Sequence, residues 1–190
     1  MTIEKLLTFT QDFTRLVETR AGEEQILTDG SKLLSSLVAS DDWLPEIFTR
    51  HHPQYYQQYL LYADPLNRLS IVSFVWGPGQ KTPVHDHLTW GLVGVLRGRE
   101  KATSYKKQAD GSFQPTKSSV LLPGETTAVS PNIGDVHEVS NDLSDRVSIS
   151  IHVYGANIGR IQRHVFDPAT GEEKMFVSGY ASNIVPNLWS

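Results

Sequence analysis

Apolar residues in the first 50 positions recur every three or four residues, which is the period of an amphipathic α-helix. They are Leu6, Phe9, Phe13, Leu16 and Val17 in a first stretch, and Ile26, Leu27, Leu33, Leu34 and Leu37 in a second. Thr2 is a candidate N-cap for the first helix, and a third, short helix is predicted to start near Asp41 or Asp42. An amphipathic stripe usually buries its apolar face, so we predict that residues 1–50 form a helical cap against the main body.

From about residue 55 the pattern changes to short β segments separated by Gly and Pro. The predicted strands are 55–62, 69–76, 90–96, 101–107, 118–122, 126–129, 136–139, 147–154 and 164–166. Many short strands with turn signals between them are typical of a β-sandwich or a closed barrel. No repeat or linker interrupts the chain, so we predict one domain over residues 1–190. It would consist of the helical cap, a β-barrel core over 55–166 and a C-terminal extension over 167–190.

Composition narrows the chemistry that this chain can perform. Its 190 residues include no cysteine, which excludes a disulfide framework, a thiolate zinc site, an iron–sulfur cluster and a cysteine nucleophile. The net charge of −4 argues against nucleic acid as a partner. The beginning of the chain does not resemble a signal peptide, and no apolar run is long enough to span a membrane. We therefore expect a soluble, cytoplasmic protein without a membrane partner, and any metal must be held by His, Asp or Glu.

Histidines at three places suggest a site. In a strand, side chains two apart share a face, so His85 and His87 can point at one metal ion while Asp86 points away. Two histidines this close also arise by chance on a surface. His137 follows the turn signals around Gly134 and, taken alone, is more typical of a surface or packed residue near a turn than of a ligand. Imidazole is the commonest protein ligand for metals near neutral pH, which keeps a metal site among the hypotheses.

The predicted strand 147–154 alternates strictly between apolar and polar residues. Ser150, His152 and Tyr154 therefore project in a row from one face. One interpretation is a half-buried strand whose polar face lies in water. The other places this face in the interior, where Ser150 and His152 would relay orientation or protons to the Tyr154 hydroxyl near the metal.

Taken together, the two histidine contexts resemble the two motifs of the cupins. The first motif comprises Gly79, His85, His87 and Gly98, and the second comprises Gly134, His137 and Asn141. The resemblance implies a mainly β fold, the cupin double-stranded β-helix, which is a small antiparallel barrel. Where the commonest cupin pattern has a metal-binding Glu this chain has Gly91, and the nearest acid, Glu100, lies beyond Gly98. The resemblance thus implies three neutral histidine ligands, a set that suits Fe(II) with open positions but is also accepted by zinc or nickel.

The stretch from Gly77 to His87, the later His137 and the Ser150/His152/Tyr154 series together resemble the cysteine dioxygenase-like thiol dioxygenases, which are iron-dependent cupins. The resemblance implies that the chain oxidises a small thiol to a sulfinate with both atoms of O2. On this basis the metal ligands are His85, His87 and His137, while Tyr154, positioned by His152 and Ser150, orders the bound substrate and O2.

Two departures from the mammalian-type enzymes concern the substrate. Those enzymes carry a Cys–Tyr crosslink, which cannot form here because Gly91 stands at the partner position. Gln58 stands where they place an Arg for the substrate carboxylate, and a neutral amide cannot replace that bidentate contact. The bacterial branch similar to 3-mercaptopropionate dioxygenase shares this Gln and supplies an Arg after the Ser-His-Tyr strand. Arg163 matches this Arg best, with Arg160 as the second candidate.

The sequence therefore predicts a mononuclear Fe(II) dioxygenase that converts 3-mercaptopropionate and O2 to the sulfinate. L-Cysteine is the alternative substrate in the same class, and cysteamine fits less well because it lacks a carboxylate. The alternative from another class is a metal-binding cupin without oxygenase activity, either an isomerase or a small-ligand binding module. The sequence does not indicate the oligomeric state.

Overall fold

The computed structural model describes residues 3–19 and 21–189. Both predicted long helices are confirmed, as α1 (Glu4–Glu18) and α2 (Glu23–Val38). Thr2, the predicted N-cap, lies outside the described residues. The third helix is the short 3₁₀ helix η1 (Glu46–Thr49), which begins later than the predicted Asp41 or Asp42. Pro45 explains the delay, because the residue before a proline disfavours the helical conformation.

The strands also follow the predicted pattern, and all but one of the nine predicted strands both begin and end within two residues of the expected positions. The exception, β6, starts at Phe113 rather than 118. It contains Pro115, which is tolerated because β6 is an edge strand that pairs only with β5. Two strands, β3 and β11, were not predicted. The strands are β1 (Gln57–Ala63), β2 (Ser70–Trp76), β3 (Val84–His85), β4 (Gly91–Arg97), β5 (Glu100–Lys107), β6 (Phe113–Leu121), β7 (Thr126–Val129), β8 (His137–Asn141), β9 (Ser148–Tyr154), β10 (Arg163–Phe166) and β11 (Glu173–Phe176).

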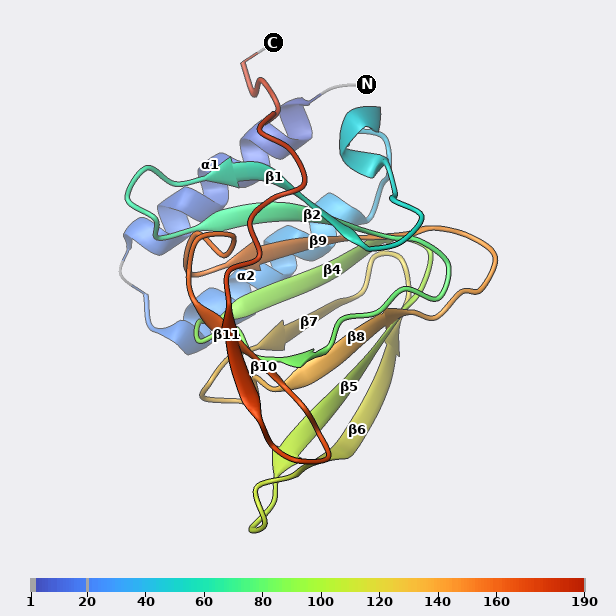
Figure 1. Ribbon diagram of the computed structural model, residues 1–190. Coiled ribbons are helices and arrows are strands. Elements are labelled where there is room, and N and C mark those ends of the chain that lie inside the picture. The colour runs from blue at the N-terminus through green and yellow to red at the C-terminus, as the bar shows by residue number, and fades with distance from the viewer. Residues whose placement is uncertain (1–2, 20, 190) are drawn as a thin grey trace.

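These strands form two antiparallel sheets that face each other (Figure 1). One sheet has the order β1-β2-β9-β4-β7, and the other has the order β11-β10-β3-β8-β5-β6. Strands distant in sequence, such as β2, β9 and β4, are hydrogen-bonded neighbours. This interleaved arrangement confirms the predicted mainly β class and the double-stranded β-helix.

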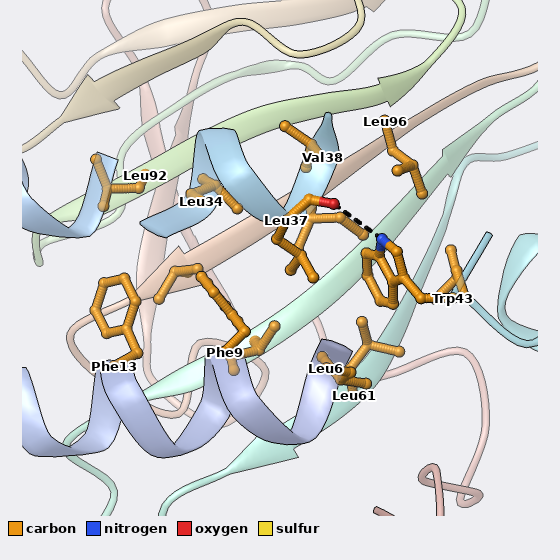
Figure 2. Close-up of a cluster of buried hydrophobic side chains, with 14 of the residues drawn as sticks. Leu6, Phe9, Phe13, Leu34, Leu37, Val38, Trp43, Leu61, Leu92 and Leu96 are labelled. Carbon is orange, nitrogen blue, oxygen red and sulfur yellow. Dashed lines mark hydrogen bonds between the residues drawn. The ribbon is translucent and has the colours of Figure 1, made fainter. Parts of the chain in front are cut away.

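The two long helices cover the outer face of the five-stranded sheet, as predicted (Figure 1). Leu34 of α2 packs so closely on β4 that a Cβ added at Gly94 would lie 2.9 Å from its Cγ. The buried Trp43 closes one end of this layer, and its indole Nε1 donates to the carbonyl of Leu37 at 3.0 Å (Figure 2). Within the described ranges, no helix is long and apolar enough to cross a membrane.

Strand β9 lies between two different environments. Ile149, Ile151 and Val153 belong to the apolar cluster under the helices. Because successive side chains of a strand point to opposite faces, the polar side chains of β9 point into the space between the sheets. Every residue of the strand is buried. The interpretation that the polar face of this strand lies in water is therefore wrong.

Candidate metal centre

A cavity of about 230 Å³ lies between the two sheets and receives side chains from both. A larger, more open hollow lies on the surface between α1 and α2, but no histidine lines it. The cavity between the sheets is therefore the better candidate site. It is lined by Tyr56, Gln58, Phe74, Trp76, Thr82, Pro83, His85, His87, His137, Val139, His152, Tyr154, Arg163, Val165, Phe176 and Ser178.

Three histidines converge in this cavity. His85 belongs to β3 and pairs in register with His137 of β8, while His87 lies just beyond the end of β3. Their ring centroids are 4.8–5.0 Å apart, and one nitrogen from each lies within 4.8 Å of the others. All three side chains are buried. The structure thus brings together the predicted ligands His85, His87 and His137.

The protonation of these rings suits a metal ion. His85 donates from Nδ1 to the carbonyl of Pro83 at 3.0 Å, and His87 donates from Nδ1 to Asp135 at 2.8 Å. Because Nδ1 is engaged in both rings, Nε2 is the nitrogen that each can present to a metal ion. Burial, with a smaller contribution from the other histidines, lowers the pKa of His85 and His137 well below the usual value. Neutral rings of this kind can hold a divalent ion without first losing a proton.

Asp135 organises the chain around His87. Its Oδ2 accepts hydrogen bonds from the backbone N–H of His87 at 3.0 Å and of Leu88 at 2.9 Å. Leu88 has φ 56°, in the left-handed region that non-glycine residues rarely adopt. The carboxylate therefore holds both the ring of His87 and the unusual backbone turn that follows it. No sequence motif indicated this role, which depends on the contact between two segments 48 residues apart.

Replacing Asp135 by asparagine is expected to weaken metal binding by roughly 10- to 100-fold, because the ring of His87 loses its charged acceptor. The measurement is the amount of metal that the protein retains after dialysis against increasing concentrations of a chelator. Asp145→Asn is the matched control, since Asp145 is exposed and its carboxylate pairs with the neighbouring Arg146. Equal metal retention in both variants would contradict this role of Asp135.

Asp86 points away from the histidine cluster, as predicted, and contacts the neighbouring strand β10. Its carboxylate accepts from the backbone N–H and from Nδ1 of His164, both at 2.8 Å. The backbone N–H of Asp86 in turn donates to the carbonyl of His164 at 3.2 Å. This reciprocal contact joins the segment that carries His85 and His87 to the strand that begins with Arg163.

The polar side chains of β9 form a continuous hydrogen-bonded chain. Ser150 Oγ lies 2.8 Å from His152 Nε2, and His152 Nδ1 lies 2.8 Å from the Tyr154 hydroxyl. The Trp76 indole donates to Ser150 at 3.2 Å, and Phe74 stacks on the His152 ring with centroids 4.0 Å apart. Aromatic rings and neighbouring hydrogen bonds thus fix His152 in one orientation.

Both titratable groups of this hydrogen-bonded series, His152 and Tyr154, are neutral near pH 7. Burial lowers the pKa of His152 well below its usual value, and His87 and His137 lower it further. Burial also raises the pKa of the Tyr154 hydroxyl well above its ordinary value, while the nearby Arg163 opposes the rise. Tyr154 therefore remains a phenol that can donate a hydrogen bond at the cavity, where its ring stacks on His87 with centroids 5.3 Å apart.

The sequence model of the family described as cysteine dioxygenase type I matches residues 26–167, which is well over half of the chain. The chain belongs to the cysteine dioxygenase type I family. This result confirms the predicted resemblance at the level of the family.

Solved structures similar to this cysteine dioxygenase family member include a cupin superfamily protein from Desulfitobacterium hafniense. It is 13% identical with a TM-score of 0.44, over 65% of this chain and 88% of that chain. Another is an uncharacterised conserved protein with a double-stranded β-helix domain from Klebsiella pneumoniae. It is 16% identical with a TM-score of 0.47, over 70% of this chain and 87% of that chain.

Gly91 lies beside Tyr154 in this family member, as expected for the residue at the position of the crosslinking cysteine. It pairs in register with Tyr154, and an added Cβ would lie 2.9 Å from two carbons of the Tyr154 ring. A side chain at residue 91 would therefore press directly on this ring. Among the described residues, the group able to hold a metal ion consists of three histidines and includes no carboxylate.

The two arginines considered for substrate binding lie in different environments. Arg163 is the first residue of β10, is only 4% exposed and lines the cavity. Arg160 is exposed and does not line the cavity. Gln58 of β1 lines the same cavity as Arg163. The structure therefore brings Gln58 and Arg163 together with the histidines and leaves Arg160 outside.

Several cavity residues were missed from the sequence. Tyr56, Phe74 and Phe176 supply aromatic walls, and Ser178 supplies a hydroxyl. Tyr56 stacks on Phe74 with centroids 6.0 Å apart. Phe176 and Ser178 come from the predicted C-terminal extension, where neither residue stands in a recognisable motif.

Glu100 lies outside the histidine cluster but is buried on the inner side of β5. Its Oε1 accepts from Ser148 at 2.9 Å, whereas its Oε2 has no hydrogen-bond partner. Burial raises the pKa of this carboxyl to about 8, although the Ser148 hydroxyl acts in the opposite direction. Glu100 is therefore predominantly a neutral acid at pH 7.

Proposed function

We propose that this protein is an Fe(II)-dependent thiol dioxygenase that converts 3-mercaptopropionate and O2 to 3-sulfinopropionate. The observation that carries the proposal is one cavity that holds the three histidines together with the buried cation of Arg163. Membership of the cysteine dioxygenase type I family supports the reaction class. A metal ion held by the histidines would bind the thiol end of a thiol carboxylate, and Arg163 would bind its carboxylate end.

The histidine set supports a metal with open positions. Three imidazole ligands would leave the double charge of a divalent ion uncompensated, which favours anionic ligands such as a thiolate. When bound, the ion would supply the Lewis acidity that keeps the substrate sulfur deprotonated and the redox chemistry with O2. His85, His87 and His137 would hold it.

Arg163 supports a substrate with a carboxylate. Within the described part of the chain this side chain makes no ion pair, and its buried Nε has no hydrogen-bond partner. Desolvation lowers the pKa of the guanidinium, because a buried charge without a counter-ion is unfavourable. A bound carboxylate would supply the missing counter-ion and accept from the free N–H.

The other cavity residues would orient the substrate and exclude water. Tyr154, held by His152 and Ser150, would donate its hydroxyl proton to the substrate or to oxygen beside His87. Gln58 would offer neutral amide contacts to the substrate chain. Phe74 and Tyr56 would keep the space between the two polar ends apolar.

The lining favours 3-mercaptopropionate over L-cysteine. No Asp or Glu lines the cavity within the described residues, so the ammonium group of cysteine or cysteamine would have no carboxylate partner. A buried charge without a partner is costly, whereas 3-mercaptopropionate carries no ammonium group.

The decisive experiment combines metal analysis with O2 consumption. Protein purified without added metal is analysed for iron, zinc and nickel, and an O2 electrode then follows turnover of 3-mercaptopropionate, L-cysteine and cysteamine. We expect iron and the highest kcat/KM for 3-mercaptopropionate. Iron-loaded protein that consumes no O2 with any of the three thiols would instead support the alternative of a cupin without oxygenase activity.

A further inference from the structure

Residues 176–181 continue from the end of β11 to the backbone of β1, and we call them the C-terminal strap (Figure 1). It lies beyond residues 26–167, which match the family model. Its side chains alternate in direction. Phe176 and Ser178 line the cavity, whereas Val177 between them is 51% exposed. The strap therefore contributes to the site with one face only.

Backbone contacts fasten the C-terminal strap to the other side of the cavity. Gly179 N–H donates to the carbonyl of Gly159 at 3.0 Å, and Ala181 N–H donates to the carbonyl of Gln58 at 2.8 Å. The ring of Tyr180 lies directly on Gly159, where an added Cβ would be 2.4 Å from it. The strap thus connects the end of β11 to the loop before β10 and to β1.

The C-terminal strap contacts the guanidinium of Arg163 in two ways. Arg163 Nη2 donates to Ser178 Oγ at 2.8 Å. The guanidinium carbon also lies 4.6 Å from the centroid of the Phe176 ring, and Phe176 is the register partner of Arg163. A hydroxyl and an aromatic face both attract a cation without neutralising it. The charge of Arg163 and its unpaired Nε therefore remain available to a ligand.

We propose that Ser178 and Phe176 are positioning residues that hold Arg163 toward the cavity and so make the site selective for thiols with a carboxylate. This inference rests on the proposed function, since it assigns the substrate carboxylate to Arg163. Without the two contacts the long side chain would sample other rotamers, and the binding of each carboxylate would then require Arg163 to be ordered again.

The first test is Ser178→Ala in the iron-loaded full-length protein. Loss of a hydrogen bond to a charged group is expected to raise KM for 3-mercaptopropionate about tenfold, with kcat little changed. KM for cysteamine, which has no carboxylate, should stay the same. The Ki of propionate, a carboxylate without a thiol, should rise in parallel with KM for 3-mercaptopropionate. Ser178→Thr keeps the hydroxyl and should restore both constants, and Ser182→Ala, on a residue that does not line the cavity, is the matched control.

The second test is Ser178→Asp, which places a carboxylate beside Arg163. This carboxylate is expected to form an ion pair with the guanidinium and to compete with the substrate carboxylate. It should therefore raise KM for 3-mercaptopropionate by more than Ser178→Ala does. It also offers a partner to an ammonium group, so KM for cysteamine should fall. The two KM values would thus change in opposite directions in response to a single substitution.

Two outcomes would overturn the inference. One is an equal change of KM for both thiols in Ser178→Ala, which would indicate a general loosening of the cavity. The other is no change in Ser178→Ala while Arg163→Ala loses the carboxylate substrate selectively, which would leave the proposed function intact. If Arg163→Ala shows no selective loss, the carboxylate assignment in the proposed function itself fails.

Discussion

Replacing Arg163 by alanine is expected to lower kcat/KM for 3-mercaptopropionate by about 100-fold or more, mainly through KM. The reason is that removal of one partner of a buried charge pair costs roughly 2–5 kcal/mol. Arg163 is 4% exposed, and no lysine or second arginine of the described residues lines the cavity, so no neighbouring cation can take its place. Cysteamine, which has no carboxylate, should be affected much less. Initial rates of O2 consumption across a range of each thiol measure both constants.

Arg160→Ala is the matched control, because Arg160 belongs to the same segment but is exposed and lies outside the cavity. Its kinetic constants should equal those of the wild type. If Arg160→Ala gave the selective loss, the carboxylate would bind at the surface instead. An equal response of both thiols to Arg163→Ala would show that Arg163 does not recognise the carboxylate.

Replacing Glu100 by glutamine is expected to change how stability depends on pH. The pKa of this carboxyl is about 8 in the folded protein, against an ordinary value of 4.5. Between these values the folded protein keeps a proton that the unfolded chain has released, so rising pH favours unfolding by about 1 kcal/mol per pH unit. The glutamine variant does not titrate. Its free energy of unfolding relative to wild type should therefore rise from about pH 5 to about pH 8 and stay level below pH 4.5.

Urea unfolding at several pH values, with equal metal content in both proteins, measures this difference. Over the whole window the effect is expected to be a few kcal/mol, a large fraction of the stability of a typical domain. Glu24→Gln, the same change on an exposed residue of α2, is the control and should give a curve parallel to wild type. A parallel curve for Glu100→Gln would show that the carboxyl ionises normally in the folded state.

Much of the fold was predictable because its signals are local. The period of Leu6, Phe9 and Phe13 is enough to indicate a buried helix face, and the alternation in residues 147–154 is enough to indicate a strand. The strands that escaped prediction carry little local signal. β3 has two residues, and β11 is an edge strand whose first three side chains are exposed. Both exist because a neighbouring strand pairs with them.

The site residues that stand in recognisable sequence motifs could be predicted. The resemblance named His85, His87, His137 and Arg163, and the structure brings all four to one cavity. Periodicity alone could not decide whether the polar face of β9 lies in water, because that depends on the second sheet packing over it. Asp135 has no local pattern either, since its role depends on contacts with a segment 48 residues earlier.

The paired contact between Asp86 and His164 has a consequence for which molecules can fit. It fastens the segment with the histidine ligands to the strand that starts at Arg163, with both side-chain contacts at 2.8 Å. These hydrogen bonds couple the position of the histidine segment to that of Arg163. Under the proposed function, a thiol acid with one methylene fewer or more than the preferred substrate would therefore lose either its sulfur contact or its carboxylate contact. The separation between the histidine cluster and Arg163 would in this way select substrates by chain length.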